Sequence, residues 1–160
     1  MKIIEVKKGQ LLQRKGDLDS KAYQVKSGLL RSYSIDEKGK EHLYMFAPEN
    51  WIIADSIPPN SPCDLYIDAL EDSVVLQLDK NIDHVSDSKK LIRRLAVLQT
   101  RIVMLMSASA IERYAHFLET YPDIVQRVPQ RMVASYLGVT PEALSRAKAH
   151  YLKKTDPRQS

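Results

Sequence analysis

The sequence has 160 residues, 44% of them apolar and 28% charged, which is ordinary for a globular protein of one medium domain or two small ones. No apolar run approaches the ~18 residues of a transmembrane helix, and no signal-peptide pattern opens the chain, so no membrane partner is predicted. The single cysteine excludes an internal disulfide and an iron–sulfur cluster and fits a cytoplasmic location.

Charge is distributed unevenly along the chain. Residues 1–88 hold 11 Lys/Arg and 15 Asp/Glu, whereas residues 89–154 hold 12 Lys/Arg and only 4 Asp/Glu. A basic second part indicates either a polyanion as partner or a solvated basic helix face.

The first part reads as β-structure. Short alternating runs are separated by turn-forming residues, as at Ser27-Gly28, in the hairpin sequence DEKGKE (36–41) and in the proline-rich loops after Phe46. Several short strands punctuated in this way predict a barrel or sandwich for a domain spanning 1–88.

From residue 89 the period becomes helical. The apolar positions follow 4, 3, 4, 3 spacing, which predicts a helix over 89–108 that either packs on its own domain or pairs with a second copy of the chain in a homodimer. The residues of this dimer seam are Leu91, Leu95, Leu98, Ile102 and Leu105.

A third segment, 109–160, is predicted to be a helix-turn-helix domain. Ser109 and Glu112 form a capping-box sequence, so a helix is expected over 110–120. Further on, the residues have the spacing that two helices joined by a tight turn require: Ala134 is small, Gly138 tolerates a left-handed conformation, and Val139 is apolar. Thr140 and Pro141 are suitable N-cap and first residues for the second helix.

The exposed side of this second helix carries candidate DNA contacts. Glu142 can accept from cytosine N4 and Arg146 can donate to guanine, with Ser145 beside them, although Glu142 and Arg146 also have the spacing of an ordinary intrahelical ion pair. Four further residues are placed for phosphate contacts: Gln130, Arg131, Thr140 and Lys148.

This combination resembles the Crp/Fnr superfamily of bacterial transcription regulators, and in particular a branch common in Bacteroidetes. The segments that carry the resemblance are SGLLRSYSIDEKGKEH, ENWIIADS, ALEDSVVLQLD and the long stretch from Ile111 to Lys148. It implies an α+β fold: an antiparallel β-roll (double-stranded β-helix) of the cyclic-nucleotide-binding type, a long dimerisation helix and a C-terminal helix-turn-helix. It also implies double-stranded operator DNA, a second copy of the chain and RNA polymerase as partners, and no enzymatic activity.

The sequence also departs from the family pattern. Pro141 stands where a base-reading arginine is usual, and no obvious wing follows Lys154. In the possible effector pocket (Trp51, Asp55, Cys63 and Asp64), Ala54-Asp55 replaces the family's Gly-Glu pair, and no arginine is present to hold a cyclic phosphate. We therefore expect no tight cAMP binding and predict no cofactor, with the effector left open.

Other chemistries find less support in the sequence. No motif supports haem ligation by His42 or His84, and the two histidines lack the ligand spacing of a cupin-like metal enzyme. We interpret both as ordinary strand or loop residues, predict no metal site, and interpret Trp51 as a core aromatic rather than a ligand platform. The alternatives to a DNA-binding regulator are such a β-barrel enzyme or an interaction scaffold that does not bind DNA.

Overall fold

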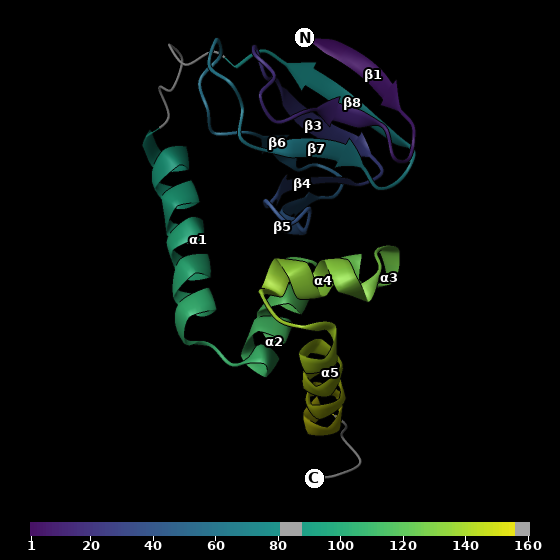
Figure 1. Cartoon of the computed structure of the whole chain (residues 1–160), viewed down its shortest axis with the longest axis vertical. Helices are drawn as coiled ribbons and strands as arrows, with labels where there is room; N and C mark the ends of the chain where they lie inside the picture. Colours follow the sequence, from purple (N-terminus) through teal and green to yellow (C-terminus); the bar gives the residue numbers. More distant parts are fainter. Residues whose placement is uncertain (81–87, 156–160) are drawn as a thin grey trace. The chain divides into compact units, whose positions relative to one another are not determined.

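The computed structural model describes residues 1–80 and 88–155, without the side chains of residues 88–91, 93, 94 and 155. The chain divides into two compact units, Met1–Val85 and Ser86–Ser160, each described here by itself. Figure 1 shows that strands make up the first unit and helices the second. The predicted boundaries at 88/89 and 108/109 stay predictions.

The first unit consists of two four-stranded antiparallel sheets. One sheet has the order β1-β8-β3-β6 and the other β2-β7-β4-β5, so strands distant in sequence pair in both. The α+β fold class with an antiparallel β-roll is therefore confirmed. The strands are β1 (Lys2–Val6), β2 (Leu11–Gln13), β3 (Ala22–Ser27), β4 (Leu30–Ile35), β5 (Glu41–Ala47), β6 (Ile52–Ala54), β7 (Tyr66–Ala69) and β8 (Ser73–Leu78).

Alternation along the strands creates the core of this unit. Tyr23 and Val25 of β3 point inward, and Val25 pairs in register with Val75 of β8. Ile53 of β6 is also completely buried, whereas its neighbour Ile52 faces outward. The core cluster comprises Val6, Tyr23, Val25, Leu30, Ala47, Ile53, Ile67, Ala69 and Val75.

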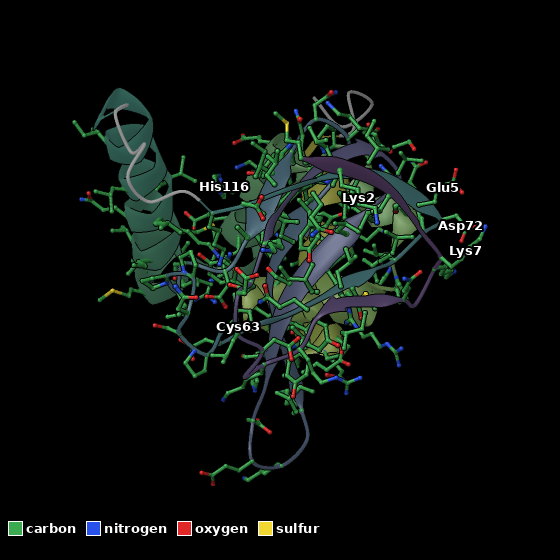
Figure 2. All side chains as sticks on the ribbon, turned by 90° about the horizontal axis from the view of Figure 1, so that it is seen from above. Lys2, Glu5, Lys7, Cys63, Asp72 and His116 are labelled. Atoms are coloured by element: carbon green, nitrogen blue, oxygen red, sulfur yellow. The ribbon has the colours of Figure 1, made fainter. Side chains whose placement is uncertain are left out.

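Two turns at one end of the roll are joined through Asp72. Its Oδ1 accepts from the backbone N–H of Lys8 at 2.9 Å, and its Oδ2 lies 2.9 Å from Lys7 Nζ, so Lys7 and Asp72 appear together in Figure 2. Gly28 has a φ of 88° in the predicted turn between β3 and β4. A Cβ there would lie 2.6 Å from the carbonyl oxygen of Asp72, so only glycine fits.

One buried charge in β4 was not predicted from the sequence. Arg31 donates in a bidentate manner to Asp68 of β7, through Nε at 2.8 Å and Nη2 at 2.9 Å, and Nη1 donates to Glu41 at 2.6 Å. Its guanidinium also lies 4.1 Å from the ring centroid of Tyr33. Burial acts to lower the pKa of Arg31, but the two carboxylates outweigh burial and raise it. The side chain therefore joins three strands as a fixed cation.

The second unit begins with the helix predicted for 89–108 and continues with shorter helices. The capping box is present: Ser109 N donates to Glu112 Oε2 at 2.7 Å, and Glu112 N donates to Ser109 Oγ at 3.4 Å. The four-residue helix before Pro129 was not predicted. The helices are α1 (Ser88–Ser107), α2 (Ala110–Thr120), α3 (Ile124–Arg127), α4 (Gln130–Leu137) and α5 (Pro141–Thr155).

Aromatic packing forms much of the core beneath α4. Phe117 of α2 is fully buried, and its ring centroid lies 5.4 Å from those of Tyr121 and Tyr136. Both separations lie within the range of about 4.5–7 Å at which aromatic rings attract one another. These contacts anchor α4 on α2, while Tyr114 of α2 makes an edge contact with Tyr151 of α5 at 5.7 Å.

Candidate nucleic-acid interface

The turn between α4 and α5 is built on Gly138. Its φ of 64° and ψ of 34° lie in the left-handed region, and its N–H donates to the carbonyls of Ala134 and Ser135. The N–H of Val139 donates to the same Ala134 carbonyl at 3.0 Å. These bonds satisfy the last carbonyls of α4 and reverse the chain, as the sequence predicts.

Helix α5 begins with the cap that its sequence predicts. Thr140 Oγ1 accepts from the backbone N–H of Ala143 at 3.2 Å, and Pro141 is the first helical residue. Leu144 and Ala147 of α5 are buried, together with Val133, Ala134 and Leu137 of α4. The buried stripe fixes which side of α5 faces away from α4.

The opposite side of α5 carries the predicted base-reading residues. Glu142, Ser145 and Arg146 are all exposed, as is Thr140 at the start of the helix. Their spacings of three and four residues place them on one helical face. The structure thus brings together on α5 a carboxylate, hydroxyls and a guanidinium that can reach a ligand.

The predicted phosphate contacts lie on two helices. Gln130 and Arg131 are exposed in the first turn of α4, and Lys148 of α5 is half-buried. A half-buried lysine can still present its ammonium group, because its stem lies along apolar surface while the charge reaches water.

The carboxylate of Glu142 is stabilised in its charged form. Its pKa is lowered first by a hydrogen bond from its own backbone N–H, then by the Thr140 hydroxyl, and to a smaller extent by the charge of Arg146. The ion pair that the spacing allows is therefore a minor cause, and at neutral pH α5 presents an anionic acceptor and a cationic donor side by side.

Helix α1 presents apolar side chains to solvent. Leu95 and Ile102 of the predicted seam are each 57% exposed, and Met106 is 80% exposed. Leu98 is half-buried, and Leu91 lies outside the described side chains. Leu105 is half-buried as well: its Cδ2 lies 3.7 Å from where a Cβ on Gly138 would be, so it contacts the helix-turn-helix turn.

The predicted effector pocket is largely occupied by its own loop. Asp55 is buried, its Oδ1 accepts from Ile57 N at 2.7 Å, and its Oδ2 accepts from Asp64 N and Leu65 N at 2.9 and 2.8 Å. Both carboxylate oxygens therefore hold the backbone between β6 and β7, as an Asx-type turn does.

The remaining pocket candidates divide between interior and surface. Cys63, labelled in Figure 2, is buried, with Sγ 3.0 Å from the Arg14 carbonyl oxygen, and burial raises the pKa of its thiol. Asp64 is exposed. The interpretation of Trp51 as a core aromatic is wrong: it is 36% exposed, because it precedes β6 and the inward position of that strand is taken by Ile53.

The histidines give no metal centre in the described residues. His42 Nε2 lies 2.8 Å from Asp36 Oδ2 at the β4–β5 hairpin, and this contact is the largest cause of the lowered pKa of Asp36. His84 lies outside the described residues. Within 1–80 and 88–155, no group of three His, Cys, Asp or Glu side chains is placed to hold a metal ion, and no described helix is long and apolar enough to cross a membrane.

Two functional candidates escaped the sequence reasoning. Arg101 of α1 and Arg113 of α2 both reach the C-terminal end of α4, where Nη1 of Arg113 donates to the Leu137 carbonyl at 3.0 Å. In the sequence they resemble ordinary solvated helix cations, and no local pattern distinguishes them.

Comparison with known proteins gives a family for the β-roll and a shared fold for the chain. Residues 3–82 match the family model "Cyclic nucleotide-binding domain". The fumarate and nitrate reduction regulatory proteins of Yersinia pestis and Escherichia coli K12 are 26% and 25% identical, over 92% of this chain and 68% of theirs.

Solved structures show the same fold. FixK2 from Bradyrhizobium japonicum superposes with a TM-score of 0.77 at 20% identity, covering 96% of this chain and 85% of that one. A CRP/FNR family transcriptional regulator from Thermus thermophilus gives 0.71 at 17% identity, covering 96% and 87%. The chain belongs to the cyclic nucleotide-binding domain family.

Proposed function

We propose that this chain is a sequence-specific DNA-binding transcription regulator that acts as a homodimer. The observation that carries the proposal is the two-sided construction of α5. Leu144 and Ala147 are buried behind the left-handed turn, while Glu142, Ser145 and Arg146 are exposed on the other side. In helix-turn-helix proteins this side of the second helix lies in the major groove.

Each exposed residue has a definite proposed role. Arg146 donates to guanine O6 and N7, Glu142 accepts from cytosine N4, and Ser145 contacts an adjacent base edge or phosphate. Gln130, Arg131, Thr140 and Lys148 contact phosphates and fix the register on DNA.

The proposed dimer forms through α1. Leu95, Ile102 and Met106 expose apolar surface that a second α1 would cover, and burying such side chains contributes about 25 cal/mol per Å². A symmetric pair of α1 helices would also supply the second reader that one short recognition helix needs. RNA polymerase as a further partner, a cytoplasmic location and membership of a Bacteroidetes branch complete the proposal, although the relatives named above are proteobacterial.

The β-roll is proposed as a sensor for another effector or as a scaffold, without tight cAMP binding and without a resident cofactor. Asp55, which stands in the sequence where the family has its ribose-binding glutamate, already accepts three backbone hydrogen bonds. The 51–70 segment contains no Arg or Lys to pair with a cyclic phosphate. Isothermal titration of the full chain with cAMP should show no micromolar binding, and such binding would contradict this part of the proposal.

The salt dependence of DNA binding tests the interface quantitatively. Arg131 and Lys148 give four cationic phosphate contacts per dimer, so log K should fall with log [NaCl] at a slope of about −4 or steeper. Arg131→Ala should reduce the slope by about 2, because each dimer loses two contacts. Lys38→Ala, in the exposed β4–β5 hairpin, removes the same charge and should leave the slope unchanged. A slope near zero for the native protein would contradict the proposed interface.

A further inference from the structure

Two arginine side chains from different helices end on the last turn of α4. Arg113 of α2 donates through Nη1 to the Leu137 carbonyl at 3.0 Å. Arg101 of α1 approaches the Tyr136 carbonyl with Nη2 at 3.5 Å, and its guanidinium lies 4.1 Å from the Tyr136 ring centroid. The last carbonyls of a helix carry partial negative charge, so guanidinium groups are matched partners for them.

Arg113 also holds the end of α1. Its Nη2 donates to the Leu105 carbonyl at 2.8 Å, and its Nε donates to the Ala108 carbonyl at 3.0 Å. One planar guanidinium therefore binds three carbonyls from two helix ends, which the single ammonium of a lysine cannot reproduce in the same geometry.

The joint between α1 and α2 is short. Helix α1 ends at Ser107 and α2 begins at Ala110, so the helical backbone is interrupted at residues 108 and 109. Next to this break, the Leu105 side chain and Arg113 Nη1 lie 3.7 and 3.6 Å from where a Cβ on Gly138 would be. The end of α1, the start of α2 and the turn before α5 thus meet at Arg113.

We propose that Arg113 is a positioning residue that fixes the orientation of the α4–α5 reader on the dimerisation helix α1. The inference rests on the proposed function, because orientation matters when two readers of a dimer must reach half-sites at one spacing. Without the brace, each reader keeps its own contacts, but the separation between the two readers varies. Arg113 would therefore govern the choice of half-site spacing rather than the reading of bases.

The first test measures affinity of the full chain for DNA selected by the native protein, as one half-site and as two half-sites with the spacing changed by one or two base pairs. Arg113→Ala should bind the single half-site with an affinity within about threefold of native. We expect the native protein to bind paired half-sites at the selected spacing at least about tenfold more tightly than at altered spacings, and this preference should fall below about threefold in Arg113→Ala. Arg113→Lys, which keeps the charge without the fork, should lose the preference too. Lys153→Ala, with an equal loss of charge at the exposed end of α5, should retain it.

The inference is overturned if Arg113→Ala or Arg113→Lys keeps the native spacing preference. It is also overturned if Arg113→Ala weakens binding to the single half-site as much as it weakens binding to the paired half-sites, because the residue would then support the reader itself. Failure of the native protein to bind any DNA would instead contradict the proposed function.

A second measurement tests the brace without DNA. Spin labels at the exposed positions Ala96 of α1 and His150 of α5, in a Cys63→Ala background diluted with unlabelled chains, report the distance between these helices within one protomer. The native chain should give one narrow distance distribution, and Arg113→Ala a broad one. Equally narrow distributions in both would overturn the inference, whatever the DNA result.

Discussion

Replacing Asp55 by asparagine tests whether this carboxylate supports the fold of the roll instead of waiting for a ligand. Asparagine has the same shape, but one oxygen becomes an NH2 group. In the better orientation the remaining oxygen still accepts from Asp64 N and Leu65 N, while the new donor faces the N–H of Ile57, which now bonds Oδ1 at 2.7 Å.

The expected magnitude follows from that geometry. Losing one charge-assisted bond and leaving a buried donor unsatisfied should lower the free energy of unfolding by about 2–3 kcal/mol. Asp55→Ala removes the acceptor of all three backbone donors and should cost about 4–5 kcal/mol. Asp64→Asn changes an exposed carboxylate in the same loop and should stay within about 0.5 kcal/mol of native.

Urea unfolding monitored by Trp51 fluorescence measures these differences in the right part of the chain, because Trp51 is the sole tryptophan and lies in the first unit. If Asp55→Asn unfolds within about 0.5 kcal/mol of native, the three hydrogen bonds do not stabilise the loop, and the argument against a ligand role for Asp55 fails.

Three further predictions concern the second unit. Arg146→Ala should reduce discrimination at one base pair of the operator by about 1–3 kcal/mol, measured by anisotropy with single-base variants, and unchanged affinity for every variant would contradict base reading. Ile102→Glu should make the protein monomeric in light scattering, since it places a charge on the exposed seam, and an unchanged mass of two chains would refute the α1 dimer. Gly138→Ala should lower the free energy of unfolding by about 1–2 kcal/mol in thermal denaturation, because φ there is 64° and a Cβ would meet only ordinary contacts; an unchanged midpoint would refute the strain argument.

Local signals in the sequence predicted local structure well. Gly138, Thr140 and the Ser109–Glu112 capping box act within four residues of themselves, so their spacing determined the turn and two helix starts correctly. The alternation Tyr23–Val25 likewise identified the inward face of β3.

What depends on distant partners was not predictable in the same way. The Arg31–Asp68 pair joins residues 37 positions apart, and an arginine in a strand carries no local sign of burial. Arg113 binds carbonyls, which every residue has, so no sequence pattern distinguishes its role. Trp51 was misplaced because hydrophobicity alone does not reveal that it lies before its strand begins.

The measurement that tests the account most directly is selection of bound sites by the full chain from a random pool of double-stranded DNA. The account predicts enrichment of an inverted repeat with two half-sites about one helical turn apart, containing a G·C pair whose discrimination depends on Arg146. No enrichment, or one asymmetric site bound by a single chain, would contradict the central claim that this protein reads DNA as a homodimer.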